Sequence, residues 1–257
     1  MKEIKRIKNQ VQENLFVETY TPDSSVKGTM VLCHGITGCR KGRHMNDDYF
    51  QTFADMMCAK GFKVVLFDYS GHGESEGDSV DVCISKNTRE LEIVMAAEVD
   101  TSKPIYFLAF SYGAAILCNY LQKNPRIDPS KIVLYSPCLY PLESCFLNKK
   151  SIFGCDVCKA YYSGQMGEQG FALVGAKGFK LGINIINECK TFIPDYLGKY
   201  SDRILAISGE DDVILDTSYN VDFFERFSIK NLWLKASHSL VETIDDAFAH
   251  TVEYFEA

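Results

Sequence analysis

Short, almost entirely apolar runs alternate with longer amphipathic stretches along most of this chain, and this alternation limits its fold more than any other feature. The apolar runs cover residues 28–35, 63–69, 104–110, 131–136, 203–209 and 229–235. Stretches with helical spacing cover residues 49–60, 85–98, 112–123, 216–226 and 239–255. Buried strands that alternate with helices form a parallel sheet covered on both faces, so the sequence predicts an α/β fold. Residues 14–20 are a candidate for an antiparallel strand at the sheet edge.

The segment 138–200 breaks this rhythm, because it is too long for an ordinary connection between a strand and a helix. Six of its aromatic residues need something to pack against: Phe146, Phe153, Tyr161, Tyr162, Phe171 and Phe179. We therefore expect residues 138–200 to form an inserted cap, or lid, over the carboxyl edge of a core made by residues 1–137 and 201–257. The alternative is a crossover helix followed by a disordered loop.

Composition narrows the class of protein. A length of 257 residues suits one large α/β domain. The chain has 27 basic and 34 acidic side chains, a formal charge of −7, so nucleic acid is not an expected partner. The lysines of the N-terminus precede no apolar run, and no stretch has the roughly 18 apolar residues of a membrane helix. We expect a cytoplasmic protein with no membrane partner.

Ten cysteines in such a chain are expected to be reduced thiols. Those in apolar segments act as small hydrophobic residues, as at Cys33, Cys58 and Cys118. A second group comprises Cys138, Cys145, Cys155 and Cys158. This group has one CxxC pair but no second close pair, so free thiols are favoured over a metal site. We expect no metal and no cofactor.

The five residues Ala109-Phe-Ser-Tyr-Gly113 lie where a predicted strand ends and a helix begins. This is nearly the pattern G-x-S-x-G, in which a serine stands on a sharp, strained turn with its hydroxyl exposed. The residues two before and two after the serine approach each other across the turn, so both must be small. Ala109 and Gly113 meet this requirement, which makes Ser111 the candidate nucleophile.

A serine hydroxyl needs a base to take its proton, and the chain has five histidines. His238 follows the last predicted strand and precedes the last helix, so its loop can reach the end of the strand before Ser111. His34 and His72 lie in glycine-containing turns and are expected to be structural, whereas His44 and His250 are expected to be exposed. His238 is therefore the candidate base.

The base in turn needs an acid that fixes its tautomer. The segment Gly209-Glu-Asp-Asp-Val-Ile214 ends a predicted strand and offers three acids. We favour Asp212 over Asp211, with Glu210 and Asp216 as weaker alternatives. Nucleophile, acid and histidine then follow one another along the chain in the order typical of α/β hydrolases.

Acyl transfer also needs donors for the negative oxygen of the tetrahedral intermediate. The backbone N–H of Tyr112 is one candidate, since it follows the nucleophile. The second is the N–H of Ile36, in the loop His34-Gly-Ile-Thr-Gly38, for which a simple glycine turn is the alternative. The glycine-rich loop at residues 70–77 lacks the ending of a phosphate-binding loop, so no nucleotide is expected.

With these motifs, the chain resembles single-domain α/β hydrolases of the bacterial cinnamoyl and feruloyl esterase type. It also resembles the related serine aminopeptidases and monoacylglycerol-lipase-like hydrolases. The matching pieces are residues 32–38, 67–77, 109–113, 209–214 and 237–239. The resemblance implies a triad of Ser111, Asp212 and His238, an oxyanion hole at Ile36 and Tyr112, and no cofactor. The esterase elbow reads G-H-S-Q-G-G, and this chain has different residues at four of those positions: Ala109, Phe110, Tyr112 and Ala114.

We therefore expect a serine hydrolase that cleaves a small-molecule acyl ester through an acyl-enzyme. It is either a carboxylesterase, for which the cinnamoyl or feruloyl type is one candidate, or an acyl thioesterase. A serine aminopeptidase is the first alternative, and it needs an acid beside the pocket to bind the free amine. Its candidates are Glu143, Asp156, Glu168 and Glu188. A non-catalytic binding protein with the same fold is the second alternative.

Overall fold

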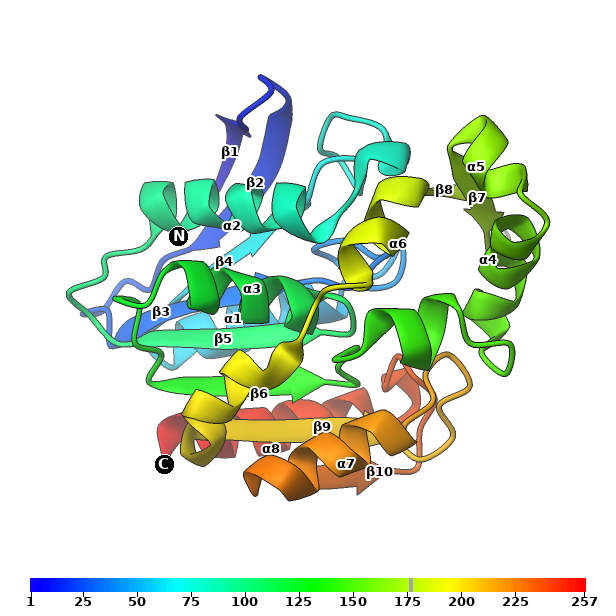
Figure 1. The fold of residues 1–257 in the computed structure, drawn as a ribbon. Helices are drawn as coiled ribbons and strands as arrows, with labels where there is room; N and C mark the ends of the chain where they lie inside the picture. The colour runs from blue at the N-terminus through cyan, green and yellow to red at the C-terminus, as the bar shows by residue number, and fades with distance from the viewer. Residues whose placement is uncertain (176–177) are drawn as a thin grey trace.

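A computed structural model describes residues 1–175 and 178–257 of the chain. Within these residues, eight strands form one sheet in the order β1-β2-β4-β3-β5-β6-β9-β10 (Figure 1). The pairs from β4 to β10 are parallel, whereas β2 pairs antiparallel with both β1 and β4. The predicted parallel sheet and its antiparallel edge are therefore confirmed.

The strands of this sheet are β1 (Lys2–Lys8), β2 (Asn14–Tyr20), β3 (Gly28–Cys33), β4 (Phe62–Phe67), β5 (Ile105–Phe110), β6 (Lys131–Tyr135), β9 (Ile204–Gly209) and β10 (Lys230–Leu234). The helices of the core are α1 (Tyr49–Ala59), α2 (Ile84–Glu98), α3 (Gly113–Lys123), α7 (Ser218–Phe227) and α8 (Ile244–Glu256). Short helical turns are η1 (Ser79–Asp81) and η4 (Val241–Thr243).

Helices cover both faces of the sheet, as the apolar strands require. Successive strand residues point to opposite faces, so Val31 packs with residues of α2 and α3 while Met30 packs with residues of α1 and α8. On the second face, the rings of Phe53 and Phe248 stack with centroids 4.5 Å apart. Figure 1 shows α2 and α3 in front of the sheet and α1 and α8 behind it.

The last helix begins later than the sequence predicts. It was expected from residue 239, but α8 starts at Ile244. Leu240 has a left-handed backbone with φ of 58°, which an α-helix does not accommodate, and its N–H donates to the carbonyl of Ser237 in a tight turn. This turn holds His238 beyond the end of β10, so the delayed start belongs to the site.

Residues 138–200, which we call the insertion, lie between β6 and β9 and have regular structure of their own. Their elements are the π-helical turn η2 (Pro141–Phe146), α4 (Ile152–Tyr162), α5 (Gln165–Gln169), β7 (Phe171–Val174), β8 (Phe179–Gly182), α6 (Ile183–Cys189) and the start of η3 (Pro194–Arg203). Strands β7 and β8 pair antiparallel with each other.

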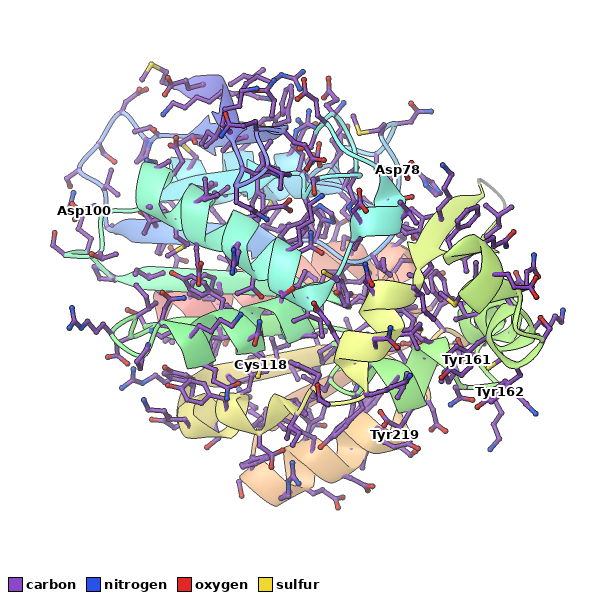
Figure 2. The ribbon with its side chains drawn as sticks, turned by 45° about the horizontal axis from the view of Figure 1, so that its top comes forward. Asp78, Asp100, Cys118, Tyr161, Tyr162 and Tyr219 are labelled. Carbon is purple, nitrogen blue, oxygen red and sulfur yellow. The ribbon has the colours of Figure 1, made fainter. Side chains whose placement is uncertain are left out.

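The insertion is attached to the core and does not bury all of its aromatic side chains. The carboxylate of Glu188 accepts hydrogen bonds from the backbone N–H and the hydroxyl of Ser85, at 2.8 and 2.5 Å. Phe146 is fully buried, whereas Tyr162 is 65% exposed on the outer side of α4 (Figure 2). Tyr162 packs at the surface instead, with its ring edge-on to that of Tyr161 at a centroid distance of 5.3 Å.

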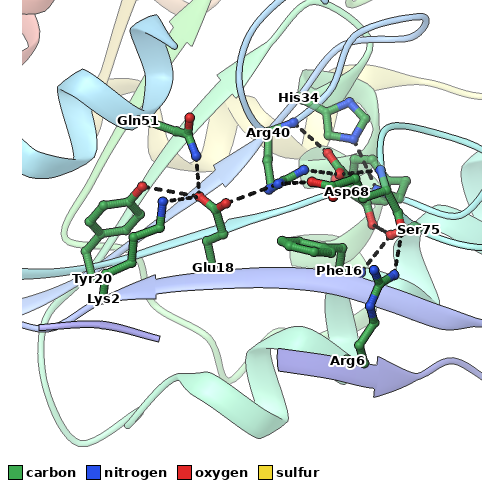
Figure 3. A network of polar contacts seen from close by, with 12 residues as sticks. Lys2, Arg6, Phe16, Glu18, Tyr20, His34, Arg40, Gln51, Asp68 and Ser75 are labelled. Atoms are coloured by element: carbon green, nitrogen blue, oxygen red, sulfur yellow. Dashed lines mark hydrogen bonds and ion pairs between the residues drawn. The ribbon is translucent and has the colours of Figure 1, made fainter. Parts of the chain in front are cut away.

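A buried arginine fixes the loop between β3 and α1 (Figure 3). Arg40 is 1% exposed, and its guanidinium donates to the carboxylate of Asp68 at 2.6 Å, lies 3.1 Å from that of Glu18 and also pairs with Glu74. Its backbone N–H donates to the other oxygen of Asp68 at 2.7 Å. The guanidinium lies 3.9 Å from the ring centre of Phe16. Arg40 therefore joins this loop to β2 and to the end of β4.

We expect Arg40→Ala to lower the free energy of unfolding by about 3–5 kcal/mol, because the buried carboxylates of Glu18 and Asp68 lose their counter-ion. Denaturant unfolding followed by circular dichroism measures this change. Arg203→Ala is the matched control, since Arg203 pairs with Asp128 at the surface and its loss should cost less than about 1 kcal/mol. Equal losses in the two variants would contradict an anchoring role for Arg40.

Candidate active site

Ser111 stands on a strained turn between β5 and α3. Its φ is 52°, in the left-handed region that serine rarely adopts. Its N–H donates to the carbonyl of Tyr135 at 2.8 Å, and its carbonyl accepts from the N–H groups of Ala114 and Cys138 at 3.0 and 2.9 Å. The backbone of Ser111 is thus held from both sides, which leaves its hydroxyl directed away from the sheet end.

The turn needs small residues around it, and at Gly113 the close neighbour is the end of β3 rather than Ala109. A methyl group added at Gly113 would overlap the carbonyl oxygen of Cys33. One added at Gly35 would lie 3.0 Å from the Cβ of Ser111, closer than ordinary packing allows. Ala109 is completely buried. The loop after β3 and the start of α3 therefore approach each other at backbone distance.

The structure brings together the three side chains that the sequence singled out. The hydroxyl of Ser111 lies 2.9 Å from Nε2 of His238, and Nδ1 of the same ring lies 2.7 Å from Oδ2 of Asp212. A carboxylate can only accept, so Nδ1 carries the proton and Nε2 is free to accept from the serine. The three groups form one hydrogen-bonded chain at the carboxyl edge of the sheet.

Asp212 is held for this contact, and the alternative acids point elsewhere. Its second oxygen accepts from the N–H groups of Ile214 and Leu215 at 2.8 and 3.0 Å, and its side chain is 1% exposed. Asp211 instead pairs with Lys235 at the surface. Glu210 also lies near Lys235, at 3.7 Å, and Asp216 accepts from Ser218. Sequence alone left these choices open.

The two residues that the sequence names as backbone donors lie beside Ser111. Ile36 and Tyr112 both line the cavity that contains the serine hydroxyl. Among the described residues, neither N–H donates to a protein acceptor. The two donors named from the sequence are therefore available to a ligand, and their role as an oxyanion hole stays a prediction.

Backbone strain gathers around this edge of the sheet. Among the described residues other than glycine, six have a positive φ, and four of these border the site: Thr37, Ser111, Ser136 and Leu240. Each lies in a loop that follows a different strand of the sheet. Residues held in sparsely populated conformations cost free energy and cluster at functional sites, so this distribution supports a site here.

The cavity above Ser111 has a volume of about 260 Å³ and mostly apolar walls. Its apolar lining comes from the loop after β3, from the end of β5, from the insertion and from the loop after β9: Ile36, Phe110, Cys138, Cys145, Phe146, Phe153, Val213 and Ile214. Polar and cationic side chains lie at Arg43, His44, Ser237 and Ser239. Arg43 was not among the residues predicted from the sequence. The one sequence feature that could have indicated it is its position shortly after the loop that carries Ile36.

The acids required by an aminopeptidase do not reach this cavity. Among its described lining residues, none has a carboxylate. Glu143 lines separate surface depressions, and Asp156 lies near Lys159 on the outside of α4. Glu168 is exposed, and Glu188 binds Ser85. The sequence could name these four acids but could not place them.

The thiols agree with the prediction of reduced cysteine. All ten cysteines lie within the described residues and are unpaired. Burial raises the pKa of Cys33 to about 12, as expected for a thiol that acts as a packing group. In the part of the chain that the structure describes, no group of histidine, cysteine and carboxylate side chains could hold a metal ion.

His34 and His72 are buried behind the site, as predicted for structural residues. Nδ1 of His34 donates to the carbonyl of Gly35 at 2.8 Å, and its Nε2 accepts from the N–H of Tyr69 at 3.1 Å. His72 donates to the carbonyl of Ser70 at 3.1 Å. Burial lowers the pKa of His34 to about 4 and that of His72 to about 3, so both rings are neutral at pH 7.

A protein-family model described as serine aminopeptidase, S33, matches residues 24–152, half of the chain. This range contains Ser111, whereas Asp212 and His238 lie beyond it. The comparison with curated proteins gives no match.

No helix among the described residues is both long enough and apolar enough to span a bilayer.

Solved structures of α/β hydrolases superpose on nearly the whole chain. Est1E from Butyrivibrio proteoclasticus, with ferulic acid bound, is 17% identical with a TM-score of 0.74, covering 98% of this chain and 97% of its own. A putative hydrolase from Agrobacterium vitis S4 is 14% identical with a TM-score of 0.77, covering 99% and 98%. The esterase EaEST from Exiguobacterium antarcticum is 15% identical with a TM-score of 0.70, covering 98% and 99%. At these identities the likeness shows the fold, which confirms the predicted α/β-hydrolase architecture.

The buried histidines generate a prediction about acid stability. The folded chain binds a proton on His72 only near pH 3, whereas the unfolded chain binds it near pH 6.5. Acidification from about pH 6.5 therefore favours the unfolded state, and each such histidine adds up to about 1.4 kcal/mol per pH unit. We expect His72→Asn to reduce that slope between pH 6.5 and 4, measured by urea unfolding at several pH values. His250→Asn, a change at an exposed histidine, should leave the slope unaltered.

Proposed function

The chain belongs to the serine aminopeptidase (S33) family of α/β hydrolases, and we propose that it is a serine hydrolase that cleaves carboxylic esters through an acyl-enzyme intermediate. The observation that carries this proposal is the hydrogen-bonded chain from Ser111 through His238 to Asp212 at the floor of an apolar cavity. A serine activated in this way attacks carbonyl carbon.

The proposed reaction has two steps. Ser111 Oγ attacks the carbonyl carbon of the ester while Nε2 of His238 takes its proton, and Asp212 stabilises the imidazolium. The N–H groups of Ile36 and Tyr112 hold the negative oxygen. His238 then gives the proton to the leaving alcohol, and the acyl group stays on the serine. Water then gives a proton to His238 and attacks the acyl-enzyme. His238 returns this proton to Ser111 Oγ as the acid leaves, which restores the free serine.

The insertion serves in this proposal as the lid of the acyl site. Phe146 and Phe153 line the cavity beside Ser111, so an acyl chain or aromatic ring bound there would contact them. A volume of about 260 Å³ suits a small or medium acyl group. An acyl thioester would use the same attacking groups, because only its leaving atom differs.

The name of the matched family favours aminopeptidase activity as a second candidate. That reaction needs a carboxylate to bind the amine of the substrate, and the cavity lining described above has none. Arg43 would instead repel an ammonium group at the same place. The cavity therefore favours esters over peptides with a free amino end. The non-catalytic alternative needs a disabled site, whereas here serine, histidine and aspartate are in contact.

Paired assays on p-nitrophenyl esters of two to eight carbons and on amino-acid p-nitroanilides test this function. We expect ester turnover with negligible anilide cleavage, and labelling of the chain by a fluorophosphonate probe. Ser111→Ala should abolish both the turnover and the labelling while leaving the melting temperature within a few degrees. Fast anilide cleavage with slow ester turnover would favour the aminopeptidase, and a native chain that resists the probe would favour a binding protein.

A second prediction separates Asp212 from its neighbour. In Asp212→Asn, the amide oxygen must accept from Ile214 and Leu215, so the amide NH₂ faces His238 and forces its proton onto Nε2. That tautomer cannot accept from Ser111, and we expect kcat to fall on the order of 10⁴-fold. Asp211→Asn removes the same charge one residue away and should change kcat less than about twofold. Comparable losses in both variants would contradict the role given to Asp212.

A further inference from the structure

The cavity has a cationic side that the proposed reaction does not use. Arg43 and His44 line it together with Ser237 and Ser239, which flank His238. Apolar residues of the insertion, among them Phe146 and Phe153, line the same cavity. A cavity lined by both apolar side chains and a guanidinium can discriminate between the two ends of a substrate.

The guanidinium of Arg43 is available to a ligand. Arg43 is exposed, and its Nη1 lies 3.5 Å from the hydroxyl of Ser239. Within the described residues, it has no carboxylate within 4.0 Å. The nearby acid Glu242 accepts from the N–H and the hydroxyl of Ser237, at 3.1 and 3.0 Å. Hydrogen bonds from the histidine loop, and to a smaller extent the charge of Arg43, lower the pKa of that carboxylate, which forms no ion pair with Arg43 within 4.0 Å.

The backbone of Arg43 is placed by the anchor described above. Cys39 and Gly42 exchange N–H to carbonyl hydrogen bonds of 2.9 and 3.1 Å, which closes a tight turn around the buried Arg40. On the other side, the N–H of Phe50 donates to the carbonyl of Lys41 at 3.3 Å. Arg43 therefore leaves a turn that is fixed to the core, and a charge held in this way loses less entropy on binding.

The position of Arg43 relative to His238 identifies the part of the substrate that it meets. His238 must give its proton to the leaving oxygen, so the leaving group lies on the side of the imidazole. Ser239, which Arg43 contacts, is the next residue after His238. Arg43 consequently lies on the leaving-group side.

We propose that Arg43 selects esters whose alcohol portion carries an anionic substituent, a carboxylate or a phosphate. This inference rests on the proposed esterase function and names its substrate class. The formal charge of the chain is −7, so its general field repels anions. The positive charge of Arg43 at the cavity offsets that repulsion locally. It does so only for an anionic group carried by the alcohol portion of the ester.

The test compares two acetate esters that differ in charge on the leaving group. The anionic substrate is 4-acetoxybenzoate, and the neutral one is its methyl ester. The preference ratio is kcat/KM for the anionic ester divided by kcat/KM for the neutral one, corrected for their spontaneous hydrolysis. We expect Arg43→Gln to lower this ratio about 3- to 10-fold with little change for the neutral ester. Raising the salt concentration should lower the ratio of the native chain in the same direction.

Arg126→Gln is the matched control, because it removes the same charge from an exposed residue in the connection before β6, at the opposite edge of the sheet. We expect it to leave the ratio unchanged. Arg43→Lys should retain part of the preference, and melting temperatures check that all variants are folded. A third substrate, 4-acetoxyphenyl phosphate, distinguishes phosphate from carboxylate. The anionic group that Arg43 favours is the one whose ester loses more kcat/KM in Arg43→Gln.

The outcomes separate this inference from the proposed function. If none of these esters nor the p-nitrophenyl esters is hydrolysed, the esterase function itself fails. If the neutral ester is hydrolysed and the ratio is the same in the native chain and in Arg43→Gln, the function stands and the role of Arg43 is overturned. A ratio that falls equally in Arg126→Gln would trace the preference to net charge and would also overturn it.

Discussion

The hydrogen bond between the hydroxyl of Ser111 and the imidazole of His238 joins two loops that are 127 residues apart in the sequence. Each loop leaves the carboxyl end of a strand, and each has a left-handed residue that turns the chain sharply, Ser111 in one and Leu240 in the other. The parallel sheet supplies the common edge, and Gly113 allows α3 to start against the carbonyl of Cys33. Without this close packing, the serine could not stand within reach of the histidine.

Much of the fold could be predicted, because buried parallel strands have a pattern that is visible in a single sequence. The strands of the core, the helices between them and the elbow at Ser111 all have local signals. The choice among the acids after β9 has no local signal in the sequence. It depends on which carboxylate faces His238 and which one pairs with Lys235. The late start of α8 and the structure of the insertion also depend on contacts between distant segments. The catalytic role of the assembled residues stays a prediction.

The fold and the family limit the type of reaction more tightly than they limit the substrate. The matched family is named for aminopeptidases, while the superposed structures include esterases at 15–17% identity. Loops vary more readily than the strands of the sheet. The cavity lining comes from the end of β5, from the loops after β3, β5, β9 and β10, and from the insertion. Its apolar wall, its lack of carboxylates among the described lining residues and Arg43 are therefore the features that bear on substrate choice.

The turn around Arg40 separates two parts of one loop that differ in how well they can tolerate substitutions. Residues 34–40 are tied to the sheet through Asp68 and Glu18, and they carry the backbone donor at Ile36. Residues 43–48 lie between this turn and α1, and the first two of them, Arg43 and His44, line the cavity together with the histidine loop. Residues 43–48 can thus be randomised as a cassette to change what the cavity accepts, while the stretch ahead of them preserves the backbone geometry around Ser111.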